Sequence, residues 1–188
     1  MFREDKATAL AYWLIKKAGG GSMPHKKLMK LLYLYEREQL RSKGLTLIGD
    51  RFVNMDEGPV LSETYNCMKP PKDGHPLTET GTVWRQFLSP INNFQISRRA
   101  DLPVESVLTK KQMKQAEELW DTYGKMSEKD LILFTHGLPE WHDPKGSSEV
   151  LDLLPVFLDF GYERDDALER IDRLRDLARH QAFFGSVV

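Results

Sequence analysis

Three side chains between residues 136 and 143 are the strongest candidates for catalysis or metal binding. His136 and His142 lie six positions apart and Asp143 follows directly, so the three could together hold a divalent metal ion for hydrolysis. The spacing matches neither two histidines one helical turn apart nor the His-Glu-x-x-His pattern of zinc proteases, and no further ligand is evident. A metal-dependent hydrolase built on His136, His142 and Asp143 is therefore a remote alternative.

Other patterns with chemical potential are isolated. Cys67 is the one cysteine of the chain and has no histidine beside it, so we expect a buried thiol and no disulfide. Gly19-Gly20-Gly21-Ser22 precedes a predicted helix, where backbone N–H groups can bind phosphate. It follows a helix instead of a strand and lacks the Gly-Lys-Ser/Thr ending, so we interpret it as an interhelical turn. We expect no cofactor, no metal and no enzymatic activity.

The composition narrows the classes of function. The chain has 188 residues, which suits one domain over 1–188. With 27 Lys and Arg against 28 Asp and Glu, the formal charge is −1, which argues against direct nucleic-acid binding. No apolar run approaches the length of a membrane span, and the N-terminus lacks the layout of a secretory signal. We therefore expect a cytoplasmic protein without membrane contact.

Hydrophobic periodicity predicts two helices at the N-terminus. One covers about 5–18 and ends at the glycines, and the next runs from Pro24 to Lys43, with Ser22 as its N-cap and Gly44 as its end. The main apolar face of the second helix is opposed by a basic stripe, which we interpret as a solvated face. The stripe consists of Lys26, Lys30, Arg37 and Arg41.

The segment after Gly44 changes to short β-prone runs. Leu45–Ile48 and Arg51–Met55 flank Gly49-Asp50, which is typical of a hairpin. Pro59 can open a helix that reaches Met68. Further along, Val83–Leu88 and Asn93–Arg98 are predicted as two more strands, and residues 69–81 as a surface loop.

The C-terminal half is again helical. Thr109 and Ser127 are predicted N-caps of two helices, the second with a capping box completed by Asp130. Glu149–Phe160 predicts a kinked helix or two short pieces, and Arg164–Phe184 a long helix, which together give C-terminal helices over about 148–184. We therefore predict a mainly α (α+β) single domain, with about six or seven helices and a small antiparallel sheet.

Three segments of the sequence, in this order, resemble the Panacea antitoxin domain of bacterial and phage toxin–antitoxin pairs. They are Lys30-Leu31-Leu32-Tyr33-Leu34, then the run from Gly49 to Tyr65 that contains Gly58-Pro59-Val60, and then Leu131–His136 with Pro139-Glu140-Trp141. The resemblance covers about 25–145. The chain departs from the family pattern at Glu140, which separates the proline from the tryptophan.

The resemblance implies a protein that binds a co-encoded toxin and neutralises it without catalysis. One type of family member delivers its toxin to an ATP-dependent protease, so a proteolytic adaptor is the alternative, and a homo-oligomer stays open. Tyr33 and Leu34 beside Arg37 and Arg41 suggest an apolar and basic surface for the partner. The candidate partner-binding residues are Tyr33, Leu34, Arg37, Arg41, Asp56, Gly58, Pro59 and Trp141.

Overall fold

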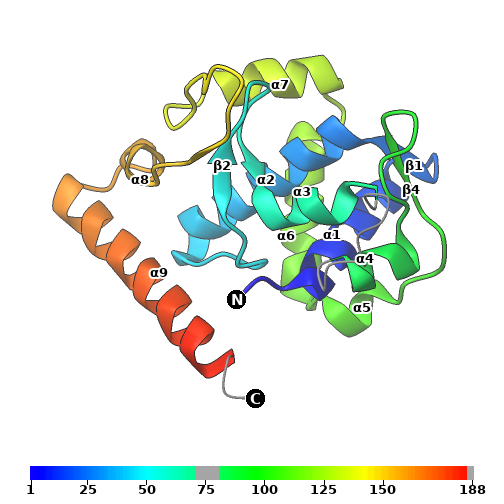
Figure 1. The fold of residues 1–188 in the computed structure, drawn as a ribbon, viewed down its shortest axis with the longest axis horizontal. Coiled ribbons are helices and arrows are strands. Elements are labelled where there is room, and N and C mark those ends of the chain that lie inside the picture. Colours follow the sequence, from blue (N-terminus) through cyan, green and yellow to red (C-terminus); the bar gives the residue numbers. More distant parts are fainter. Residues whose placement is uncertain (71–80, 186–188) are drawn as a thin grey trace.

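The computed structural model describes residues 1–70 and 81–185, and within them the chain forms nine helices and five short strands. The mainly helical fold with a small antiparallel sheet is confirmed (Figure 1). Two short helices, α4 and α5, are additional to the expected six or seven. In chain order the elements are α1 Glu4–Lys17, β1 Ser22–Pro24, α2 His25–Lys43, β2 Phe52–Asn54, β3 Val60–Leu61, α3 Ser62–Met68, α4 Thr82–Phe87, β4 Gln95–Ser97, α5 Val104–Val107, α6 Lys110–Tyr123, α7 Glu128–His136, β5 Glu149–Val150, α8 Leu154–Asp159 and α9 Arg164–Gly185.

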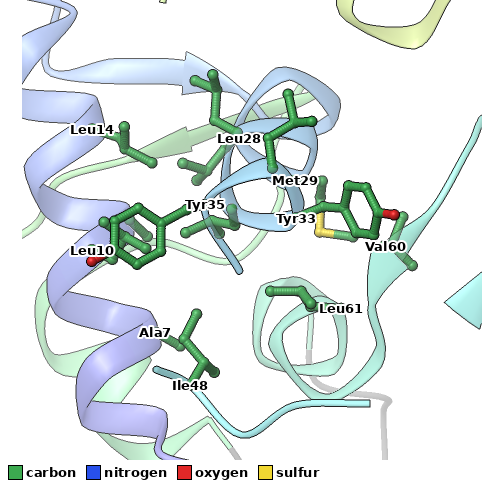
Figure 2. Packing of buried hydrophobic residues seen from close by; sticks show 14 of the residues in the cluster. Ala7, Leu10, Leu14, Leu28, Met29, Tyr33, Tyr35, Ile48, Val60 and Leu61 are labelled. Atoms are coloured by element: carbon green, nitrogen blue, oxygen red, sulfur yellow. The ribbon is translucent and has the colours of Figure 1, made fainter. Parts of the chain in front are cut away.

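Helix α2 is the central element of the fold. It packs against α1, α6, α7, β1 and β3, so it is covered on nearly every side. Figure 2 shows Tyr35 on the side of α2 that faces α1, and Tyr33 on another side, near Val60 of β3. A helix with apolar residues on several faces must bury all of them, which explains why α2 lies in the interior.

The end of α2 agrees with the sequence, but its start does not. Gly44 closes the helix with a φ of 68°, the left-handed conformation that glycine adopts readily. Ser22 is not an N-cap, because residues 22–24 form strand β1 and pair antiparallel with β4. The helix begins at His25, whose backbone N–H donates to the carbonyl of Phe94 at 2.9 Å. Pairing with a distant strand has displaced the local cap.

The predicted hairpin of Leu45–Ile48 with Arg51–Met55 is wrong. The buried carboxylate of Glu36 on α2 accepts the backbone N–H groups of Leu47 and Ile48 at 2.9 and 3.0 Å, so these groups make no ladder. Strand β2 pairs instead with β3 and β5, in the order β3-β2-β5. The hairpin turn therefore spans 55–59, with Gly58-Pro59 inside it.

One helix prediction and one strand prediction also need correction. Pro59 does not open a helix, because β3 follows it and α3 begins at Ser62. The carboxylate of Asp50 accepts the backbone N–H groups of Glu63 and Thr64 at 2.9 and 2.8 Å, which satisfies the free donors of the first turn of α3. Residues 83–87, predicted as part of a strand, lie in helix α4, and only Leu88 is extended. The Glu4 carboxylate accepts the backbone N–H groups of Gly81 and Trp84 in the same way. These distant carboxylates are invisible to local patterning.

The capping predictions of the C-terminal half are confirmed. Thr109 forms a capping box on α6, and Ser127 forms one with Asp130 on α7. The segment 149–160 does divide into two pieces, but the first is strand β5 and not a helix, and only α8 is helical, with Pro155 in its first turn. Helix α9 follows at the margin of the molecule (Figure 1).

Two further predictions concern burial and length. Cys67 is buried and free, as expected. In the part of the chain that the structure describes, no helix combines the length and hydropathy that crossing a bilayer requires. The predicted loop over 69–81 falls mainly outside the described residues.

Candidate protein-binding site

The three segments that carry the family resemblance meet at one place, which we call the motif junction: Lys30 of α2, the β2–β3 turn (residues 55–59), and residues 135–142 at the end of α7. The Lys30 ammonium donates to the carbonyl of Pro59 at 2.9 Å. The indole N–H of Trp141 donates to the carbonyl of Met55 at 3.1 Å. Segments far apart in the sequence are thus tied to one turn.

Gly58 is required at the centre of the motif junction for two reasons. Its φ of 102° lies in the region that side chains rarely adopt. A Cβ there would also lie 2.8 Å from Lys30 Nζ and 2.9 Å from Thr135 Oγ1, so α2 and α7 leave no space for one. The Gly58-Pro59 motif therefore permits a close approach of three segments, in addition to forming a stiff turn.

Glu140 anchors a buried polar network next to this turn. Its carboxylate accepts from the Tyr33 hydroxyl at 2.6 Å and from Arg37 Nε at 2.7 Å. Arg37 also donates to Asp159 of α8 at 2.6 Å. Burial lowers the pKa of Arg37, but its hydrogen bonds with Glu140 and Asp159 outweigh this and raise it. Burial, reinforced by the negative Glu140, raises the pKa of Tyr33, so the phenol stays a neutral donor.

The two histidines of the hydrolase alternative each have a different neighbour. The ring of His136 stacks on Trp141 with centroids 3.8 Å apart, and burial lowers the pKa of His136. His142 contacts Glu149 of β5 through Nε2 at 2.8 Å. Among residues 1–70 and 81–185, no three His, Cys, Asp or Glu side chains are grouped so that they could hold one metal ion. The structure therefore does not assemble His136, His142 and Asp143 into a ligand set.

A cavity of about 240 Å³ opens beside the motif junction. It has charged residues and an apolar wall made by two methionines, a valine and a tyrosine. Helices α2 and α3, the β2–β3 turn with β3, and the loop before β5 contribute to it. The lining residues are His25, Lys26, Met29 and Lys30 of α2, Met55, Asp56, Glu57 and Gly58 of the β2–β3 turn, Val60, Tyr65, Gly146 and Ser147.

The predicted apolar and basic surface on α2 is wrong. Tyr33 and Leu34 are buried in the core, and Arg37 is buried in the Glu140 network. Lys30, which we expected on the same solvated face, is only 2% exposed. Of this set only Arg41 is exposed, where it pairs with Glu38 and borders a second cavity, of about 310 Å³, between α2 and α6. The α2 motif is therefore an internal one.

The remaining candidates surround the β2–β3 turn. Asp56 is exposed and lines the cavity, and its carboxylate accepts from the Gly146 N–H at 2.8 Å. Gly58 and Pro59 are buried beneath it, and Trp141 is half-buried against Met55 and His136. Binding of a partner by Asp56, Arg41 and Trp141 stays a prediction.

Sequence reasoning missed the two residues that organise the site. In the sequence Glu140 stands out only as a residue between Pro139 and Trp141, whereas in the structure it is the buried acceptor of the network. The position of Lys30 on the helix predicts a solvated side chain. A usable signal was present, since the stripe that holds Lys30 and Arg37 is flanked by leucines and tyrosines on both sides, which indicates burial.

Comparison with known proteins agrees with this arrangement. A family model described as antitoxin SocA-like, Panacea domain, matches residues 28–142. No curated protein and no solved structure matches the chain. The matched region begins in α2 and ends just after Trp141, so it contains every segment of the motif junction. The chain therefore belongs to the Panacea-domain family of SocA-like antitoxins.

Proposed function

We propose that this chain neutralises a co-encoded toxin protein by binding it directly in the cytoplasm, and that it does so without catalysing a reaction. The cavity beside the motif junction and its rim, including Asp56 and Trp141, form the contact surface in this proposal. The toxin covers the rim and inserts a side chain into the cavity.

The observation that carries the proposal is the match to an antitoxin family over residues 28–142, in a structure whose family segments converge on one surface-accessible cavity. A cavity with an apolar wall and a few fixed polar groups favours specific recognition. Met29 and Met55 in the wall add adaptability, because methionine has several rotatable bonds and a polarisable sulfur. Adaptable walls suit a scaffold that serves different partners.

The direct test is rescue of growth. The reading frame next to the gene is expressed alone and together with this chain, and we expect toxicity that co-expression relieves. The two proteins should then copurify as a complex on size-exclusion chromatography. If the chain relieves the toxicity of no adjacent gene product, the proposal fails.

A second arm separates sequestration from delivery to a protease. Rescue should persist in a host that lacks its ATP-dependent proteases, and the toxin should accumulate in the complex. A proteolytic adaptor would instead lose rescue in that host. The chain would then lower the toxin level only in hosts that retain the proteases.

The surface is tested with Asp56→Lys, which reverses the charge of an exposed rim residue, and with Arg41→Glu as the comparison at the second cavity. Because close charge pairs at interfaces commonly contribute more than about 1.5 kcal/mol, we expect Asp56→Lys to weaken the complex about tenfold or more. Arg41→Glu should leave it within about threefold, because Arg41 lies at the second cavity and outside the contact surface proposed above. The opposite result would move the contact surface to the second cavity.

A further inference from the structure

We infer that the cavity beside Gly58 accepts an acidic side chain of the protein partner, and that the Lys30 ammonium is its counter-ion. The inference rests on the proposed function, since it names the chemistry of the group that the toxin would insert. Its test below uses a small probe and this chain alone, so the two can fail separately.

The first argument is the unusual position of Lys30. It lines the cavity although it is only 2% exposed, so it lies at the inner end, while Asp56, Glu57 and Ser147 at the rim are exposed. An ammonium group has three N–H donors. Within the described ranges 1–70 and 81–185, the hydrogen bond of Lys30 Nζ is the one to the carbonyl of Pro59, and no carboxylate lies within ion-pair distance. Buried cations ordinarily have a partner.

The second argument is that the other charges of the cavity already have partners. Glu57 forms an ion pair with Lys26 across the rim. Asp56 accepts the backbone N–H of Gly146. Lys30 is therefore the one charge of this cavity, within the described part of the chain, that has neither a counter-ion nor an exposed side chain. A carboxylate is the complementary group, because a charge-assisted hydrogen bond gains most where water is excluded.

The third argument is the shape of the access path. The wall between rim and Lys30 is made of Met29, Met55, Val60 and Tyr65, so the methylene groups of an acidic side chain would be buried along it. Pro59 and Gly58 fix the carbonyl that holds the ammonium in place. A free anion such as phosphate would gain nothing from this apolar wall. A glutamate side chain would contact the wall with its methylene groups and Lys30 with its carboxylate.

The charge state of Lys30 gives the inference a pH signature. Burial lowers the pKa of Lys30 to about 7, with Glu57 opposing this and Lys26 adding to it. The other titratable groups that face this region are His25, Lys26, Asp56, Glu57, Tyr65 and His136. A carboxylate binds the protonated amine, so binding should weaken about tenfold between about pH 6 and pH 8, because the protonated fraction falls by that factor.

The experiment follows the methyl signals of Met29 and Met55, which line the cavity, in protein labelled with ¹³C at the methionine methyl groups. N-acetyl-glutamate whose α-carboxyl is blocked as the methylamide is titrated to about 50 mM, because a single small contact gives dissociation constants on the order of 1–10 mM. The glutamine derivative with the same two blocked ends is the matched neutral probe. We expect saturable shifts with the acid and at least fivefold weaker binding of the neutral probe at pH 6. Equal binding of both probes, or shifts with neither, would overturn the inference.

Variants assign the effect to Lys30 and to the cavity. Lys30→Met keeps the unbranched shape of the side chain, one atom shorter and without the ammonium, and should abolish the preference for the acid, whereas His25→Gln should retain it. If Lys30→Met fails to fold, Ser147→Trp replaces it, because this exposed rim residue can fill the cavity without touching the core. Ser148→Trp, one position outside the lining, is its control and should bind like the wild type. A preference for the acid that survives Lys30→Met, or survives Ser147→Trp where that variant replaces it, would overturn the inference.

Discussion

Helices α2 and α9 are both rich in charged residues but place them in opposite environments. In α2, Lys30, Glu36 and Arg37 are buried. In α9, the side chains described over 164–179 are exposed except for the buried Ala167 and Ile171 and the half-buried Arg170 and Leu174. Helix α9 packs mainly on α8 and lies outside the residues that match the family, whereas α2 is in contact with five other elements.

The difference shows what the family motif encodes. Each buried charge of α2 has a partner more than ten residues away: Lys30 contacts Pro59, Glu36 contacts Leu47 and Ile48, and Arg37 contacts Glu140. The charges of α9 pair within three or four residues, for example Glu169 with Arg173. The motif is thus a set of long-range polar contacts that fixes the cavity, and α9 is stabilised by local ones.

The largest expected effect comes from Glu140→Ala. It would leave Arg37 and the Tyr33 hydroxyl buried without their acceptor, although Arg37 keeps Asp159. Breaking a buried charge pair costs about 3–5 kcal/mol of unfolding free energy, which urea denaturation would measure. Glu169→Ala on α9 is the matched control, and we expect a loss below about 0.5 kcal/mol. Equal losses in the two variants would remove the distinction between the helices.

The same network reverses one expectation. Because the sequence places Arg37 and Arg41 on the partner surface, replacing both with glutamate is expected to weaken partner binding and to leave the thermal midpoint nearly unchanged. In the structure the change at Arg37 would place a third carboxylate beside Glu140 and Asp159, so it would unfold the domain before any effect on binding could be read. Arg41 alone retains the role of a surface charge.

The next effect tests the α2 side of the comparison without altering α2. Gly58→Ala would combine an unfavourable φ with a contact of 2.8 Å to Lys30 Nζ, so we expect a loss of about 2–4 kcal/mol. Gly146 has a φ of 82° but nothing within 4 Å of its added Cβ. Gly146→Ala should therefore lower the free energy of unfolding only by the cost of the positive φ, about 1–2 kcal/mol. Similar losses, again by urea denaturation, would show that the close approach at Gly58 is not important.

The sequence predicted the features that depend on neighbouring residues. The stop of α2 at Gly44 and the caps at Thr109 and Ser127 are local, and all three are confirmed. The predictions failed where a carboxylate from a distant segment satisfies backbone N–H groups, as Glu36 does for Leu47 and Ile48 and Glu4 does for Trp84. Local patterning cannot detect such a donor–acceptor match, because it is formed only by the fold.

The sequence also failed to predict which charges of the candidate site are buried, for a similar reason. The motif segments were found, but the interior position of Lys30 follows from the packing of α2 against five elements. Helical periodicity alone places Lys30 opposite the main apolar face and so assigns it to solvent. The family resemblance located the site, and the structure was needed to show which of its charges are buried.

A smaller effect concerns the pH dependence that a buried charge of α2 imposes. Burial raises the pKa of Glu36 to about 7. Between about pH 4.5 and pH 7 the unfolded chain has released this proton and the folded chain retains it, so stability falls as pH rises, by up to about 1.4 kcal/mol per pH unit. Glu36→Gln should remove this part of the slope. Urea denaturation across the window measures it, and an unchanged slope in the variant would contradict the assignment.

The smallest effect belongs to α9 and sharpens the comparison from its other side. Arg173→Ala removes the i,i+4 pair with Glu169, two exposed side chains whose attraction is weakened by water and salt. Pairs of this kind contribute about 0.3–0.5 kcal/mol, so the free energy of unfolding of the variant should differ from that of the wild type by no more than this. The difference should shrink further at about 1 M salt. Alanine is also the better helix former, which offsets part of the loss. A loss above about 2 kcal/mol would mean that α9 is held by contacts like those of α2, and the contrast between a long-range motif and a locally stabilised helix would no longer hold.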